Sequence, residues 1–164
     1  MKTIFFIRHA KSSWDNPGLR DHDRPLNKRG LRDAPFMAKL LKGKVGSVDG
    51  ILTSSATRAL TTARYFQKAF ELPDTQFLIE PSIYEAYPED VFEAIQLCPF
   101  EGDRLLVFGH NPTFTTIANY FTDEYISNVP TCGIFRVDSD IESWSDFSRH
   151  GGKLTDFFFP KQYF

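Results

Sequence analysis

Two short segments of the chain combine side chains that can bind an anion and react with it. Arg8 and His9 follow directly on the apolar run Thr3–Ile7, and His110 follows a second apolar run, Leu105–Phe108. A guanidinium can donate two parallel hydrogen bonds to an oxyanion, and a neutral imidazole has one nitrogen with a free lone pair. These residue types predict an anion site that contains a nucleophile.

A third segment adds another cation. The run Ile51–Thr53 has the composition of a short strand, and Ser54–Ser55 is interpreted as an N-cap pair for a helix over Ala56–Phe70 that carries Arg58 near its start. If the three strands are neighbours, their carboxyl ends converge on one crevice, where open α/β sheets bind ligands. The helix starts behind the serine pair and behind Pro112 would add free backbone N–H groups. Two guanidiniums and two imidazoles then suit a tetrahedral dianion.

The elements that position these residues alternate along the sequence. The two apolar runs lack polar alternation, which is typical of strands buried on both faces. Asn27 is the expected N-cap of a helix that Pro35 should kink and that ends by Gly43–Gly46. Further strands are predicted over 48–53, 77–79, 133–138 and 153–159, and further helices over 91–97 and 113–121. This order favours an α/β fold with three α/β/α layers and a largely parallel central sheet.

Length and composition limit the possible classes of protein. The 164 residues fit one domain, 1–164, and 41% hydrophobic with 24% charged residues is ordinary for a globular protein. A net charge of −2 argues against a nucleic-acid or anionic membrane partner. Two cysteines without CxxC spacing make no zinc site and suggest a reducing compartment. No apolar stretch has transmembrane length, so we expect a cytoplasmic protein.

A long polar loop, Lys11–Pro25, separates the first strand from the first helix. Loops of this length inside a compact domain are usually functional or disordered. We expect Trp14 to pack the loop over the helix and His22 to lie at the surface. Arg24 is interpreted as a surface or ion-paired residue that lies close enough in sequence to line the rim of the crevice.

Several motifs, in order along nearly the whole chain, resemble those of the histidine phosphatase superfamily, also called the phosphoglycerate mutase-like family. The superfamily motifs are Arg8–Ala10, Ser54–Ala59 with Thr62–Ala63, and Gly109–Pro112. The sequence is more closely similar to the small phosphohistidine phosphatase branch. That similarity rests on Arg8–Trp14, Asp23–Asn27 with Gly30, Tyr84–Ala86 and Asp156–Lys161.

The resemblance implies a phosphoglycerate mutase-like fold and roles for individual residues. His9 would attack phosphorus and carry a transient phosphoramidate, while Arg8, Arg58 and His110 would bind the phosphoryl oxygens. Ser12 would either bind the phosphoryl group as well or merely cap its loop. No metal or other cofactor is implied, and acidic residues do not cluster beside the histidines in a ligand pattern.

The sequence departs from the mutase pattern. Ala10 and Lys11 stand where mutases tend to carry Gly and Glu, and Asp15 replaces an Asn that often follows the Trp. The chain also lacks an insertion long enough to cap a phosphosugar. A mutase must keep water from its phosphoenzyme, so these features favour a phosphatase with an open, shallow site that admits a protein side chain.

The sequence leaves open the role of Glu85 and the nature of the substrate. Relatives that act on phosphate esters use a carboxylic acid in this region to protonate the leaving oxygen, but Glu85 could equally be a helix-entry acid or a partner of an arginine. The substrate is expected to be a phosphorylated protein, with a small phosphate ester as the alternative. A catalytically silent phosphate-binding module is a third possibility, which the presence of all four site residues disfavours. We expect a monomer.

Overall fold

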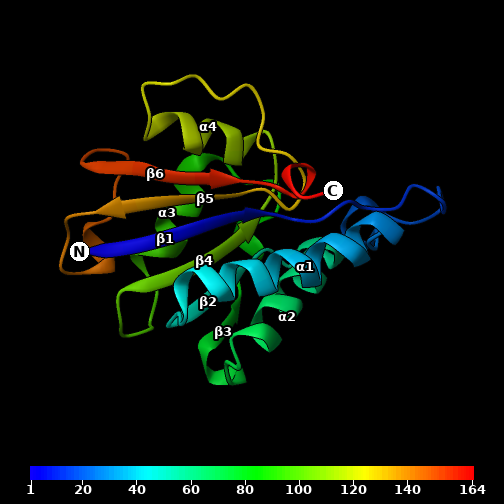
Figure 1. Ribbon diagram of the computed structural model, residues 1–164, viewed down its shortest axis with the longest axis horizontal. Helices are drawn as coiled ribbons and strands as arrows, with labels where there is room; N and C mark the ends of the chain where they lie inside the picture. Colours follow the sequence, from blue (N-terminus) through cyan, green and yellow to red (C-terminus); the bar gives the residue numbers. More distant parts are fainter.

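The computed structural model describes residues 1–164, in which six strands form one sheet with the order β3-β2-β4-β1-β5-β6 (Figure 1). Strands β1, β4, β2 and β3 pair in parallel, whereas β5 and β6 pair antiparallel at one side. The largely parallel sheet is therefore confirmed, with an antiparallel extension. The strands are β1 (Lys2–Arg8), β2 (Gly50–Thr53), β3 (Phe77–Ile79), β4 (Arg104–Gly109), β5 (Ile134–Ser139) and β6 (Gly152–Phe158).

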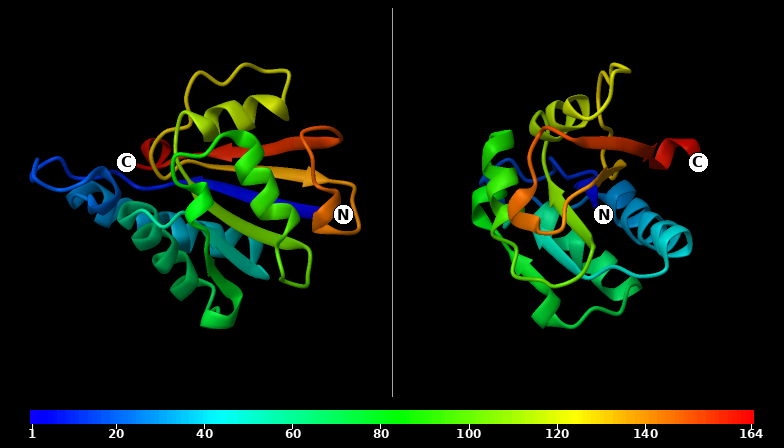
Figure 2. Two further views of the ribbon diagram at one scale, coloured as in Figure 1. Left: turned by 180° about the vertical axis from the view of Figure 1, so that it is seen from behind. Right: turned by 90° about the vertical axis from the view of Figure 1, so that its left-hand side faces the viewer.

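Helices cover both faces of the sheet, so the predicted three-layer arrangement is also confirmed (Figure 2, right). Helices α1 and α2 share one apolar core with the sheet, and α3 and α4 share another on the opposite face. Strand β1 serves both cores: Ile4 and Phe6 point to the α3–α4 side, and Phe5 and Ile7 to the α1–α2 side. The helices are α1 (Lys28–Val45), α2 (Thr57–Ala69), α3 (Pro88–Gln96) and α4 (Thr113–Tyr120).

The predicted N-cap is confirmed for α1 but not for α2. Asn27 caps α1 by accepting a hydrogen bond from the Gly30 N–H at 2.9 Å, as predicted, and α1 runs through Pro35 to its C-cap at Gly46. The predicted serine cap of α2 is wrong. The N-cap is Ala56, which has no capping side chain, and its own N–H donates to Ser54 Oγ at 3.2 Å. Ser54 lies two residues before the N-cap, so its hydroxyl faces the strand ends and not the first turn of α2.

The order of the strands places three motif-bearing strand ends side by side. Strands β1 and β4 are neighbours, with Arg8 opposite Gly109, and the His9 N–H donates to the Gly109 carbonyl at 3.1 Å. On the other side of β4, the Ser54 N–H donates to the Phe108 carbonyl at 3.1 Å. The 11–25 loop projects beyond these strand ends (Figure 1).

None of the four α-helices is both long enough and apolar enough to serve as a transmembrane segment.

Candidate active site

His9 is held as a neutral imidazole with one defined nucleophilic nitrogen. Its Nδ1 lies 2.7 Å from the Ala10 carbonyl oxygen, which can only accept a hydrogen bond, so Nδ1 carries the proton and Nε2 carries the lone pair. The residue is only 7% exposed, and burial together with the neighbouring His110 ring holds the pKa of His9 well below its ordinary value of 6.5. The ring is therefore neutral, and its free nitrogen needs no prior deprotonation at neutral pH.

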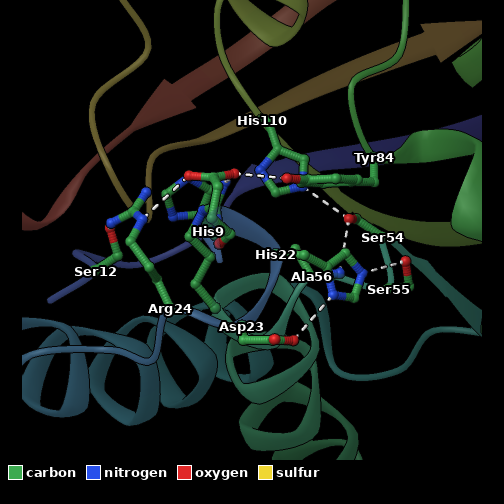
Figure 3. A network of polar contacts seen from close by, with 12 residues as sticks. His9, Ser12, His22, Asp23, Arg24, Ser54, Ser55, Ala56, Tyr84 and His110 are labelled. Atoms are coloured by element: carbon green, nitrogen blue, oxygen red, sulfur yellow. Dashed lines mark hydrogen bonds and ion pairs between the residues drawn. The ribbon is translucent and has the colours of Figure 1, made fainter. Parts of the chain in front are cut away.

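His110 lies beside His9 and is tied to the start of the second motif. The centroids of the two imidazole rings are 5.1 Å apart, and His110 Nε2 lies 2.7 Å from Ser54 Oγ (Figure 3). Burial, together with the positive charge of Arg58, lowers the pKa of His110 to about 3. Ser54 Oγ already accepts a hydrogen bond from the Ala56 N–H, so its own proton is available to His110 Nε2. With that bond, the proton of the neutral ring lies on Nδ1, where it can be donated to a ligand.

The two arginines keep part of their donor capacity free. Arg8 Nη1 donates to the Val129 carbonyl at 3.0 Å, and Arg58 donates to Asp21 through Nη1 and Nη2. Three buried nitrogens have no partner in the protein: Nε of Arg8, Nε of Arg58 and Nδ1 of His110. A buried donor without an acceptor costs about 1–3 kcal/mol. Phosphoryl oxygens are acceptors of the kind that these nitrogens lack, so the residues are compatible with the dianion that the sequence predicts.

Asp21 is a central member of the site that the sequence did not reveal. Its Oδ2 accepts hydrogen bonds from the Tyr84 hydroxyl at 2.7 Å and from Arg58 Nη2 at 3.0 Å, and its Oδ1 accepts from Arg24 Nε at 3.1 Å. Hydrogen bonds from Tyr84 and Arg58 hold the pKa of this carboxyl well below its usual range, so it stays ionised. Burial and the bond to Asp21 raise the pKa of Tyr84 to about 12, so the phenol keeps the proton that it donates.

Arg24 forms the ion pair that the sequence suggested, with Asp21, but it is buried and not at the surface. It is 7% exposed, and its Nη1 donates to Ser12 Oγ at 2.6 Å and to the Ser13 carbonyl at 3.3 Å. Trp14 does not pack the loop over the helix as expected. Trp14 is 70% exposed, and the Arg24 guanidinium carbon lies over its ring, 3.7 Å from the ring centroid. The Ser12 hydroxyl therefore accepts from Arg24, which makes it part of the loop framework.

His22 is partly buried and belongs to the rim of the site, so its expected surface position was wrong. Its Nε2 lies 2.9 Å from Ser55 Oγ, and its ring meets the Tyr84 ring edge-on with 4.8 Å between centroids (Figure 3). This contact ties the 11–25 loop to the segment before α2. The loop is thus fixed over the strand ends by His22 on one side and by Asp21 on the other.

Glu85 lies next to the site but outside the hydrogen-bond network. It is exposed, its side chain bonds no arginine, and it lines a cleft of about 680 Å³ that is also lined by His110. The cap of α3 is formed by Tyr87 and Asp90, so Glu85 is not the helix-entry acid either. Of the three interpretations that the sequence left open, the helix-entry acid and the partner of an arginine therefore do not fit this position.

Comparisons with known sequences show to which proteins the chain is similar. The sequence profile of the histidine phosphatase superfamily (branch 1) matches residues 4–86. An uncharacterised protein of Mycobacterium tuberculosis is 38% identical over 112 residues, which cover 68% of this chain and 67% of that protein. An uncharacterised chloroplastic protein of Arabidopsis thaliana is 30% identical over 155 residues, which cover 88% of this chain and 70% of that protein.

Solved structures show the same fold over almost the whole chain. A SixA protein of Agrobacterium tumefaciens, assigned as a phosphohistidine phosphatase, has 30% sequence identity and a TM-score of 0.80, with 97% of this chain and 98% of that chain covered. The protein histidine phosphatase SixA in complex with tungstate has 22% identity and a TM-score of 0.79, with 98% of each chain covered.

Proposed function

As a member of the histidine phosphatase superfamily, in its small SixA-like branch, the chain is a phosphatase, and we propose that it hydrolyses phosphohistidine on a protein through a phosphoryl group carried by His9. One observation carries this proposal. The lone pair of His9 is fixed on Nε2 by the hydrogen bond from Nδ1 to Ala10, and His9 shares the strand ends with three unpartnered buried nitrogens.

In the first step, Nε2 of His9 attacks the phosphorus atom and the bond between phosphorus and the substrate imidazole breaks. The bonding electrons return to the departing ring nitrogen, and because the other ring nitrogen of the substrate carries a proton, the imidazole leaves neutral. Arg8 and Arg58 bind the equatorial oxygens, where charge is concentrated in the transition state. The Ala10 carbonyl stabilises the phosphorylated imidazolium of His9 through its Nδ1 proton.

In the second step, a water molecule attacks the phosphorus of phospho-His9. The bond between phosphorus and Nε2 breaks, its electrons restore the lone pair of His9, and both protons of the water leave on dihydrogen phosphate. His110 is neutral, and with Nε2 accepting from the Ser54 hydroxyl its Nδ1 proton is donated to a phosphoryl oxygen in both steps. The cycle returns His9 to the protonation state in which it began.

A small-molecule phosphomonoesterase is the second candidate, and the position of Glu85 favours it. An alkoxide is a poor leaving group, so ester hydrolysis needs an acid at the leaving oxygen, and Glu85 lines the cleft beside His110. A phosphohistidine leaves as a neutral imidazole and needs no such acid. Glu85 therefore separates the two candidate functions.

The test compares a phosphohistidine-bearing protein domain with an alkyl phosphate ester, whose leaving group is an alkoxide, both in EDTA. We expect the wild type to cleave phosphohistidine and His9→Ala to lose at least about 10³-fold in kcat, because no other residue replaces the nucleophile. Glu85→Gln should stay within about threefold on phosphohistidine and should lose about 100-fold on the ester. His150→Ala, which removes an exposed histidine from the β5–β6 connection, is the matched control.

Cleavage of the ester alone, abolished in Glu85→Gln, would assign the protein to the small-molecule phosphatases. Full activity in His9→Ala would remove the nucleophile from the mechanism and the proposal with it.

A further inference from the structure

The cleft beside His110 continues away from the two arginines. Its walls are the segment that leads into α3, including Glu85 and Tyr87, and the first turns of α4, including Thr113. The Thr113 hydroxyl donates a short hydrogen bond to the Ala86 carbonyl, so the two walls are joined to each other. With about 680 Å³, the cleft has room for a side chain that extends from a group bound at His9.

The charge of the cleft is opposite to that of the phosphoryl site. Glu85 and Glu89 line it, and it is lined by no lysine or arginine. His110, which lies where the cleft and the phosphoryl site meet, is neutral because its pKa is about 3. A substrate that fills both sites therefore needs an anionic phosphoryl group at one end and a cationic group next to it.

The backbone at Glu85 has an uncommon conformation. Glu85 has a φ of 53°, in the left-handed region that favours glycine. Residues other than glycine are uncommon in this region. The conformation leaves the carboxylate exposed on the wall of the cleft.

Aromatic rings complete the surface. Tyr87 is 74% exposed on the cleft wall, where it can pack against the methylene stem of a long cationic side chain. Tyr120 also lines the cleft, and the Arg149 guanidinium already lies 4.2 Å from the centroid of its ring. The free aromatic surface is thus on the Tyr87 side, next to the two carboxylates.

We propose that this cleft recognises a lysine or arginine that neighbours the phosphohistidine in the substrate protein, with Glu85 and Glu89 as its charge partners. The inference rests on the proposed function and adds the sequence context that the enzyme prefers. It makes Glu89 a specificity-determining residue outside the phosphoryl site.

Two phosphohistidine peptides that differ only in their flanking residues, lysine in one and glutamate in the other, test this proposal. At low ionic strength we expect the wild type to favour the lysine peptide about three- to tenfold in kcat/KM. Glu89→Gln should reduce this ratio, and Glu89→Lys should abolish or invert it. Glu93→Lys is the matched control, because Glu93 lies on the same helix and is exposed, but lines a different hollow. It should keep the wild-type ratio.

The outcomes separate the two proposals. Hydrolysis of inorganic phosphoramidate by the wild type tests the proposed function alone, since its ammonia leaving group is too small to reach the cleft. If phosphoramidate and both peptides are cleaved but the peptides are cleaved equally, the cleft proposal is overturned and the proposed function stands. A ratio that changes as much in Glu93→Lys as in Glu89→Lys would attribute the effect to overall charge and would also overturn it.

Discussion

At the residue scale, the site keeps two imidazoles neutral among positive charges. Burial, the neighbouring ring and the arginines all disfavour a proton on His9 and His110, and both pKa values lie below 6.5. Such an arrangement suits a nucleophile, but it has a cost in stability. The unfolded chain binds protons on these two side chains at a pH where the folded chain does not.

The free energy of unfolding should therefore decrease as the pH falls below the unfolded-state pKa of about 6.5. Each histidine contributes a slope of up to about 1.4 kcal/mol per pH unit, until its folded-state pKa is reached, which is about 3 for His110. We expect His110→Asn to reduce the slope between pH 6 and pH 5 by about that amount. Urea denaturation of wild type and variant at several pH values measures it. An unchanged slope would mean that folded His110 already binds a proton at pH 6.

The four residues Arg8, His9, Arg58 and His110 could be predicted from sequence because each follows a recognisable strand end or helix start. Parallel pairing then brings them together, and the structure shows that it does. Asp21 could not be predicted. It lies in an irregular loop, where sequence patterns do not say which of several aspartates turns toward Arg58. The burial of Arg24 escaped prediction for the same reason.

At the element scale, the start of α1 fixes the loop that follows strand β1. The Asn27 N–H donates to the Lys11 carbonyl at 3.0 Å, and Gly30 packs against the same backbone. A Cβ on Gly30 would lie 2.3 Å from the Lys11 carbonyl oxygen, a distance that real Cβ atoms do not show. This glycine is needed because helix and loop approach closely.

A matched pair of glycines in α1 tests this contact. Gly30→Ala should destabilise the protein by about 1–3 kcal/mol and lower kcat/KM, because the Lys11 backbone must move and Ala10 lies next to it. Gly43→Ala, in the same helix with open space around its Cβ position, should stabilise the protein by about 0.5–1 kcal/mol. Thermal unfolding and steady-state rates report both. Equal effects of the two substitutions would show that helix propensity alone matters at Gly30.

The observed helices and strands agree closely with the predicted ones where the prediction rested on a pattern of apolar residues. Strands β1 and β4 were predicted from unbroken apolar runs, and α1 was predicted from Asn27 and its helical spacing. The start of α2 was mispredicted because serine is a common capping residue, whereas the Ser54 hydroxyl here bonds to His110 and to the N–H of Ala56 and to no N–H inside α2. Local sequence preferences cannot predict that the Ser54 side chain forms a hydrogen bond with a residue far away in the sequence.

At the scale of the whole molecule, the two apolar cores share one sheet. Phe5 and Phe6 are consecutive in β1, are 2% and 0% exposed, and belong to opposite cores. If the sheet came apart to unfold one core, the apolar side chains of the other core would also be exposed to water. The two faces are therefore expected to unfold together.

Phe5→Ala and Phe6→Ala test this coupling. Each should lower the free energy of unfolding by about 3–5 kcal/mol, with one transition and an unchanged dependence on urea concentration. Circular dichroism and tryptophan fluorescence, followed through the same titration, should coincide. Separate transitions in either variant would show that the two faces unfold independently.

The sheet order also determines which parts of the molecule can open without loss of the site. Strands β3 and β6 form the edges, whereas β1 and β4, which end in His9 and His110, pair with each other in the interior of the sheet. Fraying at an edge strand leaves that inner pair and its register intact. The edge strands can therefore open locally while β1 and β4 stay paired. The two histidines should be among the last residues to separate when the protein is unfolded by force.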